Sequence, residues 1–261
     1  MRAIAAILLA LASGVTSARA DVALDPLLPD SGYRHTESVG LISGLGPTGL
    51  FLNATSGILP KGAFSIESCM AFNENNGDHF AGNGVLVTYG VTDWLEISGY
   101  GLIVHGLDPA GAGSSDLEVG QVNARARLVR ESEQLPELTL GGIVAFGDDP
   151  LVAHSLFLAA SKGFTLSDRD FMRSLRVHAG IRETWPDAGN DVTTAFVGLE
   201  LEVVNHLYMI GEVNTRDSST EKTPWSAGLQ YKGESFGLSA AVMQNPGNSR
   251  ETYYVGIGVS Y

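Results

Sequence analysis

Three short stretches of the sequence contain residue types that could support chemistry. Residues 233–237 read GESFG, the spacing of the nucleophile elbow of hydrolases, and residues 44–49 read GLGPTG, the spacing of a dinucleotide-binding loop. Both motifs require a helix after a strand, but an alternating strand pattern follows the first and no amphipathic helix follows the second. His154 and Ser155 are adjacent, so in a strand their side chains point to opposite faces and cannot form a dyad with each other. We therefore expect no catalytic residue and no cofactor.

Metal sites, disulfides and nucleic-acid binding are also not expected. The only cysteine is Cys69, and a disulfide framework or a cysteine-rich metal site needs thiols in pairs or fours. Residues 73–78 read NENNGD and lack the spaced acids and the final glutamate of a calcium loop. The formal net charge of −13 would repel the phosphates of nucleic acid. A hydrophobic content of 44% is too high for a disordered chain.

The most informative charged residues stand at alternate positions, with apolar residues between them, as in Arg125 and Arg127 or Glu200 and Glu202. In a membrane-spanning strand such charges must face away from lipid, because an Arg or Lys at the midplane costs about 2–4 kcal/mol. We therefore predict that they line a lumen. The predicted lumen residues are Glu67, Glu96, Asn123, Arg125, Arg127, Arg176, His178, Arg182, Glu200, Glu202, Glu212 and Arg216.

The elements that position these charges show a period of two residues. Alternating segments of about ten residues, separated by turns, are typical of a transmembrane barrel, whereas helices would show a period of 3.6. The sequence therefore predicts an all-β fold, a transmembrane antiparallel up-and-down β-barrel of about twelve strands. The predicted strands are 63–72, 82–91, 93–104, 116–129, 136–147, 152–164, 171–183, 193–204, 206–216, 223–232, 235–244 and 251–261.

The connections between these segments alternate in length. Short turns are predicted at 92, 132–135, 165–170, 205 and 233–234, and longer polar loops at 73–81, 105–115, 184–192 and 217–222. Short periplasmic turns and longer outer loops are the asymmetry expected of an outer-membrane barrel. With an even number of strands, both ends of the barrel sequence lie on the periplasmic side.

The chain before the first strand divides into two parts. Residues 1–20 have a basic start, a short apolar stretch and the small-residue pattern ARA, which is typical of a secretory signal peptide. We expect residues 21–62 to lie under or inside the barrel as a small plug, followed by the barrel itself at 63–261. The alternative is that the apolar stretch 48–55 forms a thirteenth strand, which would place the N-terminus outside the cell.

The end of the chain alternates apolar and aromatic residues with small ones. The residues that face one side are Tyr253, Val255, Ile257, Val259 and Tyr261. This pattern resembles the C-terminal signal of bacterial outer-membrane β-barrel proteins. The resemblance implies a location in the bacterial outer membrane. It also implies outer-membrane lipid, lipopolysaccharide and the barrel-assembly machinery as partners.

Two internal stretches, 49–67 and 89–96, resemble two further groups of barrels. One is a transporter-like family associated with operons for the degradation of aromatic compounds, and the other is the exopolysaccharide-associated outer-membrane barrel family. Neither resemblance brings a catalytic motif or a site residue onto this sequence. Both imply an outer-membrane barrel.

Three functions fit these observations. The first is a passive channel or transporter for small solutes, with the lumen charges as screening groups. The second is a closed structural or assembly barrel for the envelope or for polysaccharide export, in which the same charges are fully paired. The third is an outer-membrane lipid hydrolase with a dyad formed across strands, for example by His154. The fuller motifs of the outer-membrane phospholipase and lipid A deacylase families are absent. We expect a protein that is not an enzyme.

Overall fold

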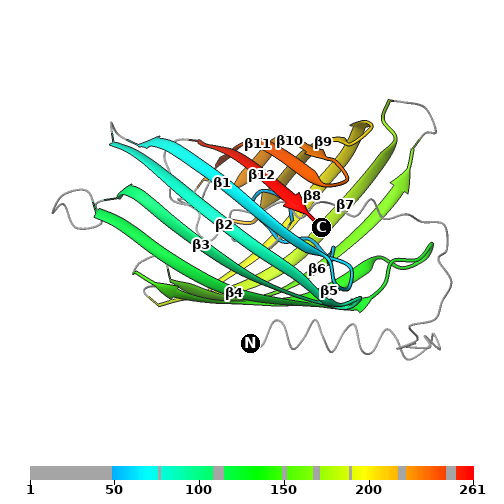
Figure 1. Ribbon diagram of the computed structural model, residues 1–261, viewed down its shortest axis with the longest axis horizontal. Coiled ribbons are helices and arrows are strands. Elements are labelled where there is room, and N and C mark those ends of the chain that lie inside the picture. The colour runs from blue at the N-terminus through cyan, green and yellow to red at the C-terminus, as the bar shows by residue number, and fades with distance from the viewer. Residues whose placement is uncertain are drawn as a thin grey trace. The chain divides into compact units, whose positions relative to one another are not determined.

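Twelve antiparallel strands close into a barrel in the computed structural model (Figure 1). The structure describes residues 49–75, 78–107, 115–148, 152–166, 171–187, 190–216, 222–244 and 251–261. Each strand pairs with its neighbours in sequence, and β1 pairs with β12 to close the barrel. The strands are β1 (Phe64–Asn75), β2 (Asp78–Thr92), β3 (Leu95–Leu107), β4 (Ser115–Val129), β5 (Glu137–Gly147), β6 (Ala153–Thr165), β7 (Ser174–Pro186), β8 (Val192–Val204), β9 (Leu207–Asn214), β10 (Trp225–Lys232), β11 (Phe236–Gln244) and β12 (Thr252–Ser260). The predicted fold class is confirmed.

The barrel has two ends, which we call the base and the mouth. The base is the end where β1 begins at Phe64 and β12 ends at Ser260, and the mouth is the opposite end. The predicted signal peptide, residues 1–20, and the rest of the chain up to residue 48 lie outside the described residues. In the described part of the chain, no helix has the length and hydropathy needed to cross a membrane.

Several predicted boundaries are wrong, most clearly at the mouth. The expected long loop at 73–81 is largely strand, because β1 continues to Asn75 and β2 starts at Asp78. The connection between β6 and β7 at the base, residues 166–173, is longer than this connection between β1 and β2 at the mouth. The predicted difference between short base turns and long mouth loops therefore does not hold throughout. β9 ends at Asn214, so Arg216 lies beyond the strand in which it was expected. Polar residues at the mouth form strand hydrogen bonds as readily as apolar ones do. The change from apolar to polar residues in the sequence therefore shows where the apolar band ends, and the strands continue beyond it.

An apolar band covers the outside of the barrel. Large apolar side chains are exposed at alternate positions of most strands, including Ile66, Val87, Ile97, Val122, Val144, Leu199, Met209, Leu229, Leu238 and Ile257. An exposed apolar surface of this extent would make a water-soluble protein aggregate, whereas it matches the lipid-facing band of a transmembrane barrel.

The terminal strand contributes to the same band. In β12 the side chains of Tyr253, Val255 and Ile257 are exposed, and Tyr261 follows the strand at 84% exposure. Val259 is half-buried. The Phe64 and Tyr261 backbones exchange two hydrogen bonds of 2.9 Å, which join the two ends of the barrel sequence. Recognition of these residues by the assembly machinery stays a prediction.

The outer band predicts a strong effect of charge at its centre. The substitution Leu199→Arg, in the middle of β8, should lower the free energy of unfolding in lipid vesicles by about 2–4 kcal/mol, because the guanidinium would enter hydrocarbon. Glu133→Arg, in the connection at the base, is the matched control and should change it little. Equal effects of the two variants on urea unfolding would contradict a lipid-facing band.

Candidate functional site

Residues 49–60 lie inside the barrel, against inward-facing side chains of the strands. Leu50, Phe51, Asn53 and Ser56 are fully buried. Polar groups of this segment bond to side chains of β3, β4, β5, β6, β7 and β9, so it contacts much of the circumference of the wall. The lumen is therefore occupied by the chain's own residues.

The first part of this segment is a tight reversal, which we call the internal hairpin (residues 49–54). Gly49 and Ala54 form an antiparallel bridge, and the Leu50 N–H donates a hydrogen bond of 2.9 Å to the Asn53 carbonyl. A Cβ at Gly49 would overlap the Asn53 carbonyl oxygen, so only glycine allows this closure. Residues 55–60, the return arm, then lead to Gly62, whose φ of 82° turns the chain into β1.

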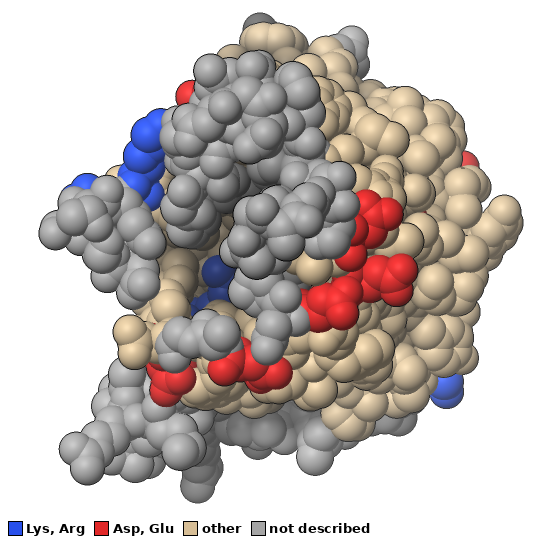
Figure 2. All heavy atoms as spheres, turned by 90° about the vertical axis from the view of Figure 1, so that its left-hand side faces the viewer, with Lys and Arg blue, Asp and Glu red and all other residues tan. Residues whose placement is uncertain are grey.

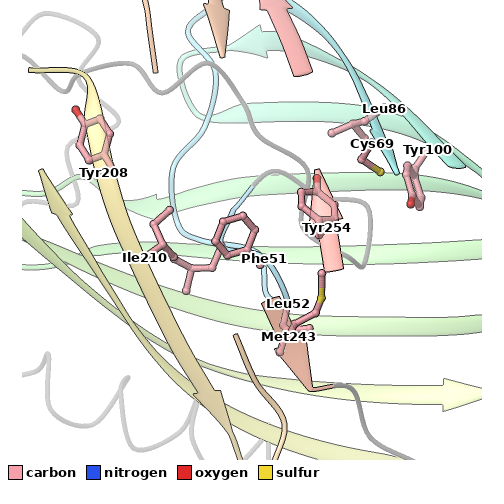
Figure 3. Packing of buried hydrophobic residues seen from close by; sticks show 10 residues of the cluster. Phe51, Leu52, Cys69, Leu86, Tyr100, Tyr208, Ile210, Met243 and Tyr254 are labelled. Atoms are coloured by element: carbon pink, nitrogen blue, oxygen red, sulfur yellow. The ribbon is translucent and has the colours of Figure 1, made fainter. Parts of the chain in front are cut away.

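Apolar packing holds the hairpin (Figure 3). Leu50, Phe51 and Leu52 form one buried cluster with side chains of six strands, namely Cys69, Leu86, Tyr100, Tyr208, Ile210, Met243 and Tyr254. Phe51 meets the Tyr254 ring edge-on at 5.8 Å between centroids. Leu50 occupies the space over Gly198, where a Cβ would overlap its side chain. Full burial of such a side chain contributes about 1.5–3 kcal/mol, so the three together stabilise the inserted position substantially.

A polar group fixes the tip of the hairpin. The Glu212 carboxylate accepts hydrogen bonds from the Leu52 N–H at 2.5 Å, from the Asn53 side-chain amide at 2.8 Å and from the Ser226 hydroxyl at 2.6 Å. The Asn53 amide also donates to Asn214 at 2.7 Å, and its oxygen accepts from Arg182 at 3.2 Å. These bonds join the hairpin to β7, β9 and β10 in the half of the lumen nearer the mouth.

A buried ion pair fixes the return arm nearer the base. Arg125 binds Glu96 through two nitrogens, at 2.9 and 2.5 Å, and both side chains are at most 2% exposed. The second Glu96 oxygen accepts from the Leu59 N–H at 2.8 Å, and Arg125 donates to the Thr55 carbonyl at 3.2 Å. Charge-assisted bonds of this kind are stronger than neutral ones, so the pair connects β3, β4 and the return arm.

Further ion pairs line the wall near the base. Glu137 accepts from Arg127 at 2.6 Å and from Arg176 at 3.1 Å, and Arg176 also pairs with Glu131 at 3.0 Å. On the neighbouring part of the wall, Lys232 pairs with Glu200, which lies beside Arg176 in the β7–β8 register, at 2.6 Å. These bonds bring predicted residues of β4 and β7 together with partners that the prediction did not include, Glu131 and Glu137.

The remaining predicted lumen residues are placed as follows. Glu67, Asn123, His178 and Glu202 are buried on inward faces, whereas Arg216 is exposed beyond β9. Asn123 donates to Ser98 at 3.2 Å, and Glu202 accepts from Ser174 at 3.0 Å. That this set lines a conducting pore stays a prediction.

The most important residue that the sequence analysis missed is Asn53. Its only sequence signal is that it is the first polar residue after a short apolar run.

His154 and Ser155, the two residues singled out in the sequence, each bond to another partner. His154 accepts from the Ala145 N–H at 3.2 Å, while Ser155 bonds to Thr184 at 3.0 Å. His178 instead contacts Ser161 at 2.8 Å within the wall. In the described ranges, no three side chains of the metal-binding types gather closely enough to hold an ion.

Charged side chains of both signs lie at the mouth. Seen from that end, acidic side chains lie to the right of and below a hollow, and Lys or Arg atoms are visible within it (Figure 2). Asp116 and Asp187 are among the acidic residues exposed near this end, and each pairs with a histidine, His105 at 2.9 Å and His154 at 3.7 Å. The lumen thus has a polar entrance above the internal hairpin.

Two solved structures with a similar fold are a porin and an outer membrane channel. The KdgM porin matches with a TM-score of 0.54 and 14% identity, over 76% of this chain and 99% of that one. The COG4313 outer membrane channel from Pseudomonas putida F1 matches with a TM-score of 0.53 and 13% identity, over 78% and 97% of the two chains. The fold is that of an outer-membrane β-barrel. The predicted resemblance to this class is confirmed, while no family model and no curated protein sequence matches the chain.

The buried Arg125–Glu96 pair predicts a large loss of stability when one partner is removed. Glu96→Ala leaves the Arg125 charge buried without its carboxylate and should lower the free energy of unfolding by about 3–5 kcal/mol. Arg173→Ala, which removes a half-exposed guanidinium 4.0 Å from Glu202, should cost less than about 1 kcal/mol. Urea titration in vesicles measures both, and similar losses would show that Arg125 and Glu96 contribute no more than a surface pair.

Proposed function

We propose that the chain forms an outer-membrane channel for small solutes and that residues 49–60 close it in the conformation described. The observation that carries the proposal is the separate segment inside the lumen, which contacts the wall from the base half to the mouth half. The apolar outer band and the charged inner wall supply the other requirements of a channel, a lipid-facing surface and a water-compatible interior.

The contacts of the segment allow it to move without opening the barrel. The hydrogen bonds between residues 52–59 and the wall described above all involve wall side chains, so the strand ladders do not depend on the segment. No residue of 49–60 is charged, so its withdrawal would expose no new charge of its own.

The wall beside the hairpin indicates the solutes that suit it. Withdrawal of Phe51 and Leu52 would uncover an aromatic and apolar patch that includes Tyr254, Met243 and Ile210. Polar and charged side chains border this patch above and below. The lumen therefore fits small solutes that combine an apolar or aromatic part with a polar group, as is typical of pockets that bind small molecules.

One substitution tests whether the hairpin closes the channel. Gly198→Ala places a methyl group where the Leu50 side chain lies, which should displace the hairpin and raise the mean single-channel current in planar bilayers several-fold. Gly99→Ala is the matched control, because a Cβ there meets nothing within 4 Å, and it should match the unmodified chain.

Two results would count against the proposal. If both variants and the unmodified chain fold in vesicles but conduct no current, the barrel is not a channel under these conditions. If all three conduct equally, residues 49–60 do not close it.

A further inference from the structure

We infer that Arg182 and Glu212 form a two-state charge clamp that regulates the internal hairpin. With the hairpin inserted they hold the Asn53 amide between them, and with it withdrawn they pair directly with each other. The inference rests on the proposed function, because it describes how the closed channel opens and what stabilises the open lumen.

The Asn53 amide is matched to both charges. Its oxygen faces the Arg182 guanidinium at 3.2 Å, and its NH₂ group faces the Glu212 carboxylate at 2.8 Å. A side-chain amide offers an acceptor to a cation and a donor to an anion at the same time, from two different atoms. Asn53 therefore bridges two opposite charges that would otherwise attract each other.

Withdrawal would clear the space between these charges. Arg182 lies on β7 and Glu212 on β9, and the intervening strand β8 presents Gly198 beside Glu212. Because Gly198 has no side chain, the volume over it is filled by Leu50 of the hairpin. When Asn53 and Leu50 leave together, the long Arg182 side chain can turn toward Glu212 across the vacated surface.

The direct pair would offset a large cost of opening. A buried charge that loses its hydrogen-bond partner is strongly destabilised, and Glu212 would lose the Leu52 and Asn53 donors when the hairpin leaves, while Ser226 stays in place. An Arg182–Glu212 bond replaces them. Both positions of the hairpin then keep these charges hydrogen-bonded, which is the property of a two-state element rather than of a permanent plug.

The chain contains its own reporter of the hairpin position. Cys69 is the only cysteine, and its side chain faces the lumen in the apolar cluster that includes Leu50, Phe51 and Leu52. A membrane-impermeant methanethiosulfonate reagent should therefore modify Cys69 slowly while the hairpin is inserted and faster when it withdraws. The modification rate reports the equilibrium without any need for an ionic current.

The first variant removes only the contacts of the inserted state. Asn53→Ala should raise the rate of Cys69 modification about tenfold, because it deletes hydrogen bonds to both charged groups. Asn205→Ala, at the connection between β8 and β9, is the matched control and should leave the rate unchanged. An unchanged rate in Asn53→Ala would overturn the clamp.

The second step separates a clamp from a simple anchor. In the Asn53→Ala chain, Arg182→Gln should lower the modification rate about fivefold, because it removes the ion pair of the withdrawn state. Glu212→Gln in the same chain should act in the same direction, and heat-modifiable migration on gels confirms that each variant is folded. If both leave the rate unchanged or raise it, no direct pair forms and the inference is wrong. Loss of conductance with these rates as expected would instead count against the channel alone.

Discussion

The way in which the lumen of this twelve-strand barrel is filled governs the rest of the structure. Eight strands enclose about the volume of their own inward side chains, whereas sixteen or more leave an aqueous channel. Here the burial of Leu50, Phe51 and Leu52 against the wall fills the middle of the lumen. Because the filling comes from a separate segment, the same barrel can be closed or open without a change in its strand pairing.

The charges of the wall have two roles that follow from this arrangement. Near the base, Arg127 and Arg176 neutralise Glu131 and Glu137 and join strands of the wall. Nearer the mouth, Glu212 and Arg182 act on the hairpin, through backbone and amide groups that carry no charge. Buried charges of one sign would be prohibitively costly. A lumen wall with this many buried charged side chains therefore needs both signs close together.

The strands were predictable because their signal is local. Alternation in β8 and β12 depends only on which face each residue occupies, and both exist close to the predicted positions. The partners of the charges were not predictable, because Leu52 and Glu212 are separated by 160 positions and meet only after the barrel closes. The stretch 48–55 left two interpretations open, because three consecutive apolar residues fit neither face of a strand. Arg216 was placed in the lumen wrongly because it continues the alternating pattern of β9, although the strand ends at Asn214. Alternation alone does not show where a strand ends.

The most direct test of the account is a reversible tether between the return arm and the wall. Ser56 and Ser161 lie close, with the Ser56 N–H 3.4 Å from the Ser161 hydroxyl, so cysteines at both positions in a Cys69→Ser chain can be joined by oxidation. Solute uptake into vesicles is then measured before and after the disulfide is reduced. The account predicts that the oxidised chain admits no solute and that reduction restores uptake to the level of the untethered chain. Equal uptake in both states would show that solutes pass without any movement of residues 49–60.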